Sequence, residues 1–307
     1  MSRYILKRLL ATIITIWVVI TVTFLLMHAI PGGPFTGEKN LPPAIKHNLE
    51  VKFGLNKPLG EQYKVYLKNL VFNLDLGPSM RYESKTVKDV INYSFKASAK
   101  LGAVTIIFAL IVGIFMGITA ALHQGRWQDG TCMVISLLGV TVPSFVLATL
   151  LIYVFSIKLR VLDVIGFDSW KSYIMPTLAL GGFSMANISR LMRSSLLDVV
   201  RQDYIRTAKA KGLSQNVVIY KHALKNSIIP VMTYLGPTIA GILTGSFVVE
   251  QIFGIPGLGR EFVQSITNRD YSTILGVTVF YSTFLVLCNF AVDILYAVVD
   301  PRIKLDS

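Results

Sequence analysis

Long runs of apolar residues dominate the hydrophobic pattern of this 307-residue chain. A helix needs about 20 predominantly apolar residues to cross the hydrocarbon core of a bilayer. Four runs reach this length and contain no Lys, Arg, Asp or Glu: 9–30, 101–122, 131–157 and 228–249. A fifth run, 274–299, contains one acidic residue, Asp293, and a sixth, 173–188, is uncharged but short. The pattern predicts an all-α membrane protein, a polytopic helical bundle with six transmembrane helices.

The segments between these runs divide the chain into three parts. Residues 1–30 comprise a short basic N-terminal end and the first transmembrane helix, which we expect to be retained as an anchor. Residues 31–100 contain turn-forming prolines and glycines and amphipathic stretches, so we expect an extracytoplasmic loop domain. Residues 101–307 form a five-helix core, with a long cytoplasmic loop at 189–227.

The distribution of charge predicts the orientation in the membrane. The chain is 53% hydrophobic, has a mean hydropathy of +0.58 and carries a net charge of +13. Fourteen of its thirty Lys and Arg residues fall in segments that alternate spans place on one side, whereas the short loops on the other side hold five. Such an excess marks the cytoplasmic side, so both termini are expected there. Because the positive charge follows the loops, we expect no nucleic-acid partner.

The loop at 189–227 is the most informative segment. It holds eight basic residues against Asp198 and Asp203. Strong helix formers fill 204–211, Gly212 interrupts them, and Ser214 is placed to cap a second helix. The pattern predicts two short helices joined at a glycine. Charge alone leaves two interpretations open, a surface for anionic lipid and a knob that docks on a soluble partner.

The same segment resembles a known family. Residues 204–230 read YIRTAKAKGLSQNVVIYKHALKNSIIP, which is similar to the EAA loop of ABC importer permeases. Gly212 stands at the glycine of that pattern, and Arg206-Thr207-Ala208 stand where it has Glu-Ala-Ala. Arg-Thr-Ala is typical of the peptide and nickel branch, although it removes any universal role for the glutamate. The outer stretch FGIPGLGR at 253–260 and both ends of the chain resemble the same branch.

The resemblance covers nearly the whole chain and implies a type I ABC importer permease fold. It implies the first permease of a pair in a bacterial inner-membrane importer of oligopeptides or dipeptides. The implied partners are a homologous second permease, two cytoplasmic ATPase subunits that use ATP and Mg, an extracytoplasmic substrate-binding protein, membrane lipid and the peptide. No cofactor and no enzyme activity are expected in this chain. Nickel or another small solute remains an alternative substrate.

The resemblance also assigns candidate residues. Gly212 would allow a positive φ angle or close approach of a partner. The residues expected to couple to the ATPase are Tyr204, Arg206, Thr207, Ala208, Lys209, Ala210, Lys211, Gly212 and Leu213. The gate or outer-loop candidates are Pro143, Gly254, Pro256, Gly257, Gly259 and Arg260.

Two acidic residues near the ends of predicted spans are further candidates. Asp293 is an intramembrane acid, for which a functional role is the default hypothesis. Its place near the cytoplasmic end favours a structural ion pair with a basic residue of 3–8, and proton coupling is the alternative. Glu250, at the outer end of the fifth span, is interpreted as an interfacial or packing residue.

Several chemistries lack their sequence motifs. No G-x-x-x-x-G-K-[ST] phosphate loop occurs, so ATP must be bound by another polypeptide. The four histidines are scattered, and we expect neither a metal site nor catalytic residues. An intramembrane serine enzyme at 182–186 would need a base within reach. An ATP-independent secondary transporter would be expected to show inverted repeats, and none is visible.

Overall fold

The computed structural model describes residues 2–30, 33–35, 42–164, 169–243 and 246–299, and the side chains of these residues from 7 to 290. The described chain is almost entirely helical. Its main helices are α1 (Ser2–Ala29), α2 (Pro43–Lys52), α3 (Leu59–Asn73), α4 (Val87–Leu122), α5 (Trp127–Thr141), α6 (Ser144–Leu151), α7 (Ile174–Val200), α8 (Asp203–Ala210), α9 (Gln215–Val217), α10 (Leu224–Ser227), α11 (Ile229–Leu243), α12 (Phe247–Ile252), α13 (Leu258–Thr267) and α14 (Tyr271–Val299). Three short turns complete the list, the π-helical η1 (Ile152–Lys158) and η3 (Val218–Ala223) and the 3₁₀ turn η2 (Trp170–Tyr173).

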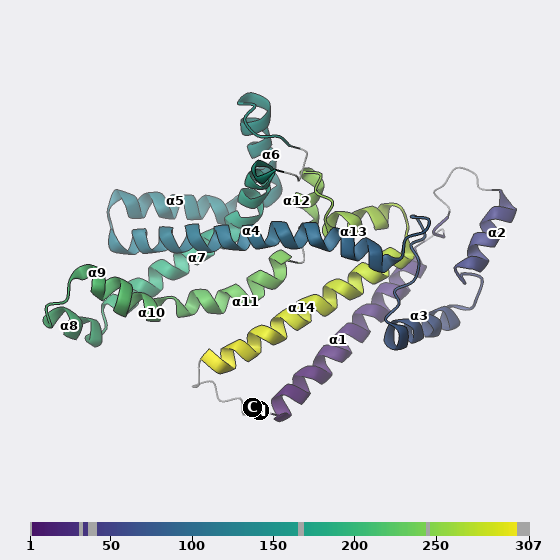
Figure 1. Ribbon diagram of the computed structural model, residues 1–307, viewed down its shortest axis with the longest axis horizontal. Helices are drawn as coiled ribbons and strands as arrows, with labels where there is room; N and C mark the ends of the chain where they lie inside the picture. The colour runs from purple at the N-terminus through teal and green to yellow at the C-terminus, as the bar shows by residue number, and fades with distance from the viewer. Residues whose placement is uncertain (1, 31–32, 36–41, 165–168, 244–245, 300–307) are drawn as a thin grey trace.

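The centre of the bundle is a close packing of α4, α5 and α7, which lie alongside one another in Figure 1. Glycines make this approach possible. A Cβ atom at Gly117 of α4 would lie 2.6 Å from the Met192 Cβ of α7, and one at Gly139 of α5 would lie 2.7 Å from the Gly182 carbonyl oxygen. Small residues at such contacts let helix backbones pack without the penalty of displaced side chains.

Membrane-spanning potential is confirmed for most of the predicted helices. Within the described residues, Lys7–Ala29, Val87–Leu122 and Tyr271–Phe290 are long and apolar enough to cross a bilayer. Two bent pairs, in α5–η1 and α9–α11, raise the number to five if each pair is one span. The sixth predicted span is the first half of α7, whose apolar sequence is interrupted by residues such as Asn187 and Arg190.

Two predicted span boundaries were wrong. Residues 131–157 do not form one helix, because the chain bends by 109° between α5 and the α6–η1 segment. Pro143 is the N-cap of α6; it lacks a backbone N–H and disfavours helical geometry in the residue before it. Consequently α6 stands out from the bundle across the direction of α5 (Figure 1). The predicted fifth span, 228–249, is also not one helix, because Ser246 has an extended backbone and caps the separate helix α12.

The two ends of the bundle carry different structures. Helices α2 and α3 lie at one end, and α8 and α9 lie at the opposite end (Figure 1). The first end is fastened by an apolar cluster in which Phe24 of α1 and Tyr271 of α14 pack with Tyr63 of α3. The hydroxyl groups of Thr21 and Tyr63 also share a hydrogen bond of 2.6 Å. Segment 42–86 therefore packs on the bundle as a folded cap.

Candidate functional site

The loop at 189–227 contains the predicted hairpin. Helix α8 ends at Ala210, Gly212 adopts φ +75°, and a second helical segment runs from α9 through η3 and α10. The Gly212 N–H donates to the Lys209 carbonyl at 3.0 Å, which closes the first helix. A Cβ atom at Gly212 would meet nothing within 4 Å. The requirement for glycine within this chain therefore comes from the left-handed backbone, which other residues adopt at a cost. Ser214 takes the predicted N-cap position, but its side chain makes no capping hydrogen bond.

One face of the hairpin packs on its own chain. Ile205 is fully buried and Ala208 is 7% exposed, and both join an apolar cluster with Leu196 of α7 and Val218 of η3. The Ala208 side chain therefore points into the protein. Ile205 was missed by the sequence reasoning, although its spacing of three residues from Ala208 places both on one helix face.

The opposite face and the tip of the hairpin are exposed. Tyr204 is also exposed, and its hydroxyl accepts a hydrogen bond of 2.8 Å from the Asn226 amide, which ties α8 to α10. Arg206 lies 3.4 Å from Asp203 in an exposed pair of little energetic weight. The remaining candidate residues on this surface are Thr207, Lys209, Ala210, Lys211, Gly212 and Leu213. The structure therefore presents a basic, narrow tip to the solvent.

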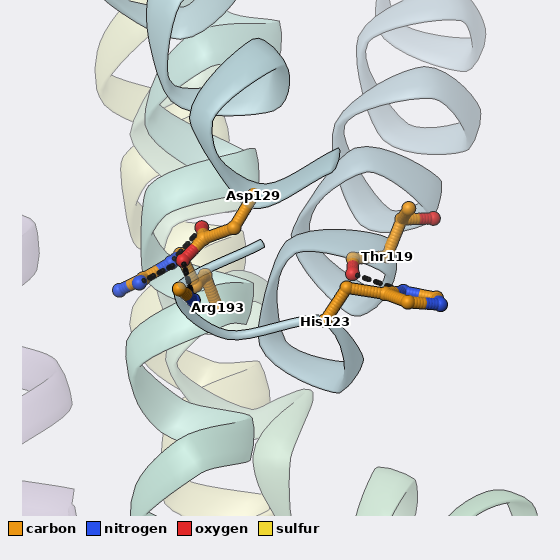
Figure 2. A network of polar contacts seen from close by, with 5 residues as sticks. Thr119, His123, Asp129 and Arg193 are labelled. Atoms are coloured by element: carbon orange, nitrogen blue, oxygen red, sulfur yellow. Dashed lines mark hydrogen bonds and ion pairs between the residues drawn. The ribbon is translucent and has the colours of Figure 1, made fainter. Parts of the chain in front are cut away.

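An ion pair behind the hairpin was not predicted. Asp129, at the start of α5, accepts two hydrogen bonds of 2.7 Å from the Arg193 guanidinium of α7. The Gly125 N–H donates to the same carboxylate at 3.0 Å. Figure 2 shows this network beside the last turn of α4, where the His123 ring bonds to the Thr119 carbonyl. The turn between α4 and α5 is thus fixed to α7 shortly before α8 begins.

The loop between α12 and α13 surrounds a buried carboxylate. Glu250 has no exposed surface, and it accepts hydrogen bonds from the Ser98 hydroxyl at 2.6 Å and the Arg260 N–H at 3.1 Å. The Ser98 hydroxyl in turn accepts the Leu258 N–H at 2.8 Å. The Glu250 carboxylate therefore joins three helices, α4, α12 and α13, by hydrogen bonds. This role goes beyond the interfacial or packing residue that the sequence predicts.

The outer-loop candidates other than Pro143 gather around this carboxylate. A Cβ atom at Gly257 would collide with the Glu250 carboxyl group, and one at Gly259 would lie 2.7 Å from the Phe247 nitrogen. The Arg260 guanidinium donates to the Gly254 carbonyl at 2.9 Å, where Gly254 has φ +64°. Pro256 lies in the same turn, between α12 and α13. Pro143 lies apart, at the break between α5 and α6.

Burial controls the acidity of this loop. Desolvation raises the pKa of the Glu250 carboxyl above its ordinary value, and the hydrogen bonds from Ser98, Arg260 and Gly259 offset part of that rise. Burial likewise raises the pKa of Glu261 on α13, which accepts a hydrogen bond from Tyr82 at 3.4 Å. The loop therefore holds carboxyl groups that are easier to protonate than exposed ones.

A second buried acid joins the cap to α14. Asp270, 2% exposed, accepts hydrogen bonds from the Ser79 hydroxyl at 2.6 Å and the Met80 N–H at 3.1 Å. It also accepts from the N–H and hydroxyl of Thr273, and so caps the start of α14.

Two further predictions concern the intramembrane acid Asp293 and metal-binding groups. Asp293 lies in α14, but its side chain falls outside the described residues, so its predicted ion pair stays a prediction. Among the described residues, no group of three or more His, Cys, Asp or Glu side chains could hold a metal ion.

Comparison with known proteins identifies the family. Residues 1–109 and 109–305 match the N-terminal and main models of the binding-protein-dependent transport system inner membrane component. The chain is 47% identical over 305 residues to the dipeptide transport system permease protein DppB of Bacillus subtilis, covering 99% of both chains. It is 45% identical over 306 residues to the oligopeptide transport system permease protein OppB of Haemophilus influenzae, covering 99% of this chain and 100% of the relative.

Solved structures show the same fold at low sequence identity. An amino acid ABC transporter chain matches with a TM-score of 0.55 and 16% identity, covering 68% of this chain and 94% of its own length. An inward-facing MetNI methionine ABC transporter matches with a TM-score of 0.54 and 16% identity, covering 69% and 97%. The helical fold is therefore that of an ABC importer permease. The family models and the sequence relatives match nearly the full length of the chain. The chain therefore belongs to the family of inner membrane components of binding-protein-dependent transport systems, as a multi-pass transport subunit and not an enzyme.

Proposed function

We propose that this chain is the first permease of a pair in an ATP-driven importer of dipeptides or oligopeptides. The observation that carries the proposal is the 44–47% identity, over 99% of the chain, to dipeptide and oligopeptide permeases. A homologous second permease completes the pathway, and an extracytoplasmic substrate-binding protein delivers the peptide.

The hairpin around Gly212 is the coupling element in this proposal. Its exposed tip enters a cleft of a cytoplasmic ATPase, and two such ATPase subunits bind ATP and Mg. Arg206, Lys209 and Lys211 provide charge for acidic groups of the ATPase, and Leu213 provides apolar contact. The inward face at Ile205 and Ala208 packs on α7 and η3, so a displacement of the tip moves the bundle. Two arrangements of the bundle, biased by ATP and by substrate, then give alternating access.

The sidedness of the molecule follows from the same assignment. The hairpin lies at the end of the bundle opposite α2 and α3 (Figure 1), so the cap faces the outside of the cell. Both termini are then cytoplasmic, in agreement with the distribution of basic loops. The loop around Glu250 joins α12 and α13 to α4, and we assign it to the outer gate.

The test is transport by the purified complex. The permease pair, ATPases and binding protein are reconstituted in liposomes, and uptake of labelled dipeptides, oligopeptides and nickel is measured with and without ATP. Uptake of peptides that requires ATP supports the proposal. Uptake of nickel in place of peptides, or uptake that ignores ATP, contradicts it.

A further inference from the structure

The exposed faces of two long helices differ in chemistry. The outward face of α4 is entirely apolar in its middle part, as expected for contact with lipid chains. Its residues there are Val104, Ile107, Ile111 and Phe115, which are 38–69% exposed. The outward face of α7 instead combines an apolar residue with polar and charged ones. Its residues there are Phe183, Asn187, Arg190 and Ser194. Arg190 lies level with Gly117 of α4, which packs on Ser189 and Met192 within the candidate span Val87–Leu122. Polar side chains at such a depth normally face a bundle interior or water, and not lipid.

The polar side chains of α7 form a hydrogen-bonded series that reaches α11. The Arg190 guanidinium donates to the Asn187 side-chain oxygen at 2.8 Å. The Asn187 amide donates to the Tyr234 hydroxyl of α11 at 3.3 Å and to the Phe183 carbonyl at 3.0 Å. Asn187 has therefore used both donor hydrogens, and its side-chain oxygen keeps one lone pair. The donors left to meet a ligand are the other guanidinium N–H groups of Arg190 and the O–H of Tyr234.

Arg190 also differs from its neighbour in how its charge is balanced. Arg193, three residues later on α7, is neutralised by the bidentate contact with Asp129. Within the described part of the chain, no carboxylate forms an ion pair with Arg190. A cation near the membrane interior is costly unless an anion or water accompanies it. The position can therefore accept a mobile anion as the counter-charge of Arg190.

We infer that Arg190, Asn187 and Tyr234 form a carboxylate site in the translocation pathway, which takes the C-terminal carboxylate of a peptide in transit. The planar guanidinium matches a carboxylate, and the Tyr234 hydroxyl adds a second donor. Asn187 positions both groups. The inference rests on the proposed function, since it names a contact for the peptide substrate.

The location links this site to the coupling hairpin. Helix α7 ends at Val200, directly before α8, and α11 follows directly after α10. An anion held between Arg190 and Tyr234 thus joins the two helices that flank the hairpin. The phosphate of a lipid offers similar chemistry, but the α7–α11 junction presents an amide and a phenol beside the cation, in contrast to the apolar face of α4.

The experiment compares two peptides in two proteins. The complete importer, with ATPases and binding protein, is reconstituted as wild type and as Arg190→Gln. Initial uptake of trialanine and of trialanine amide is measured at saturating loaded binding protein. Both importers use the same binding protein. Its preference therefore cancels when the ratio of trialanine uptake to amide uptake in the variant is divided by the same ratio in the wild type. Arg201→Gln, an exposed arginine that ends α7, is the matched charge control, and Arg190→Lys tests the guanidinium shape.

We expect Arg190→Gln to lower uptake of trialanine about tenfold, the size of one lost charge-assisted hydrogen bond, and to change uptake of the amide less than about twofold. Arg190→Lys should recover part of the loss, and Arg201→Gln should show none. An equal loss for both peptides, or no loss, would overturn the inference. A loss seen in liposomes that contain phosphatidylglycerol and absent in phosphatidylcholine alone would assign the site to lipid and also overturn it. Failure of the wild type to take up either peptide would instead refute the proposed function.

Discussion

The contact between Asp129 and Arg193 offers a quantitative test of how the α4–α5 turn is held. Asp129 is 8% exposed in its side chain and Arg193 is 26% exposed, so the pair is largely shielded from water. The carboxylate accepts three hydrogen bonds, two from Arg193 and one from the Gly125 N–H. Removing one member of such a pair leaves an uncompensated charge, which costs about 3 kcal/mol.

The assay is a double-mutant cycle on the purified permease pair. Asp129→Ala, Arg193→Ala and the double variant are unfolded in mixed detergent, and their free energies of unfolding are compared with that of the wild type. Each single variant should lose about 3 kcal/mol, and the double variant should lose less than the sum by about 2 kcal/mol. The second substitution costs little because its partner has already gone.

Additive losses would refute this reasoning. If the double variant loses the sum of the single losses to within about 0.5 kcal/mol, the two side chains act independently and the pair does not hold α5 to α7. Arg201→Ala serves as the control, because Arg201 is exposed at the end of the same helix.

Four further predictions concern glycines and a buried acid. Gly212→Ala should destabilise the hairpin by about 1 kcal/mol in the same assay, because of φ +75°, whereas Gly130→Ala, in an open helical position, should not. Gly212→Glu should leave membrane insertion intact and uncouple ATP hydrolysis from uptake, as measured in proteoliposomes; unchanged uptake would oppose the docking role. Gly257→Ala should cost stability and disturb the outer loop through collision with Glu250, seen as faster proteolysis there; a wild-type rate would contradict the packing. Burial raises the pKa of Glu250 in the folded protein, so the protonated carboxyl contributes stability that is complete below the pKa of the unfolded state and is lost as pH rises through the pKa of the folded state. Glu250→Gln should therefore flatten this part of the pH profile of the unfolding free energy. An unchanged profile would exclude the effect.

Local features of the chain were sufficient for the class of fold and for the hairpin. The length of apolar runs fixes which segments can enter a bilayer, and basic loops indicate its cytoplasmic side. The hairpin was also predictable, since strong helix formers before Gly212 and the glycine itself act over a few residues. Ser214 takes the N-cap position but makes no capping hydrogen bond. The bend at Pro143 shows where local features fall short. The proline marks the position of the break, but the angle of 109° depends on what α6 packs against.

Tertiary structure alone decided which polar groups meet. Asp129 and Arg193 are separated by 64 residues, and Ser98 and Glu250 by 152. Whether such side chains touch depends on the rotation and depth of each helix, which close packing at Gly117 and Gly139 sets. For the same reason the sequence placed Arg190 simply among the cytoplasmic basic residues, whereas the structure shows it bonded to Asn187 and, among the described residues, in no ion pair. Sequence determines which residues are available within a span, and the packing of helices determines which of them can form a site.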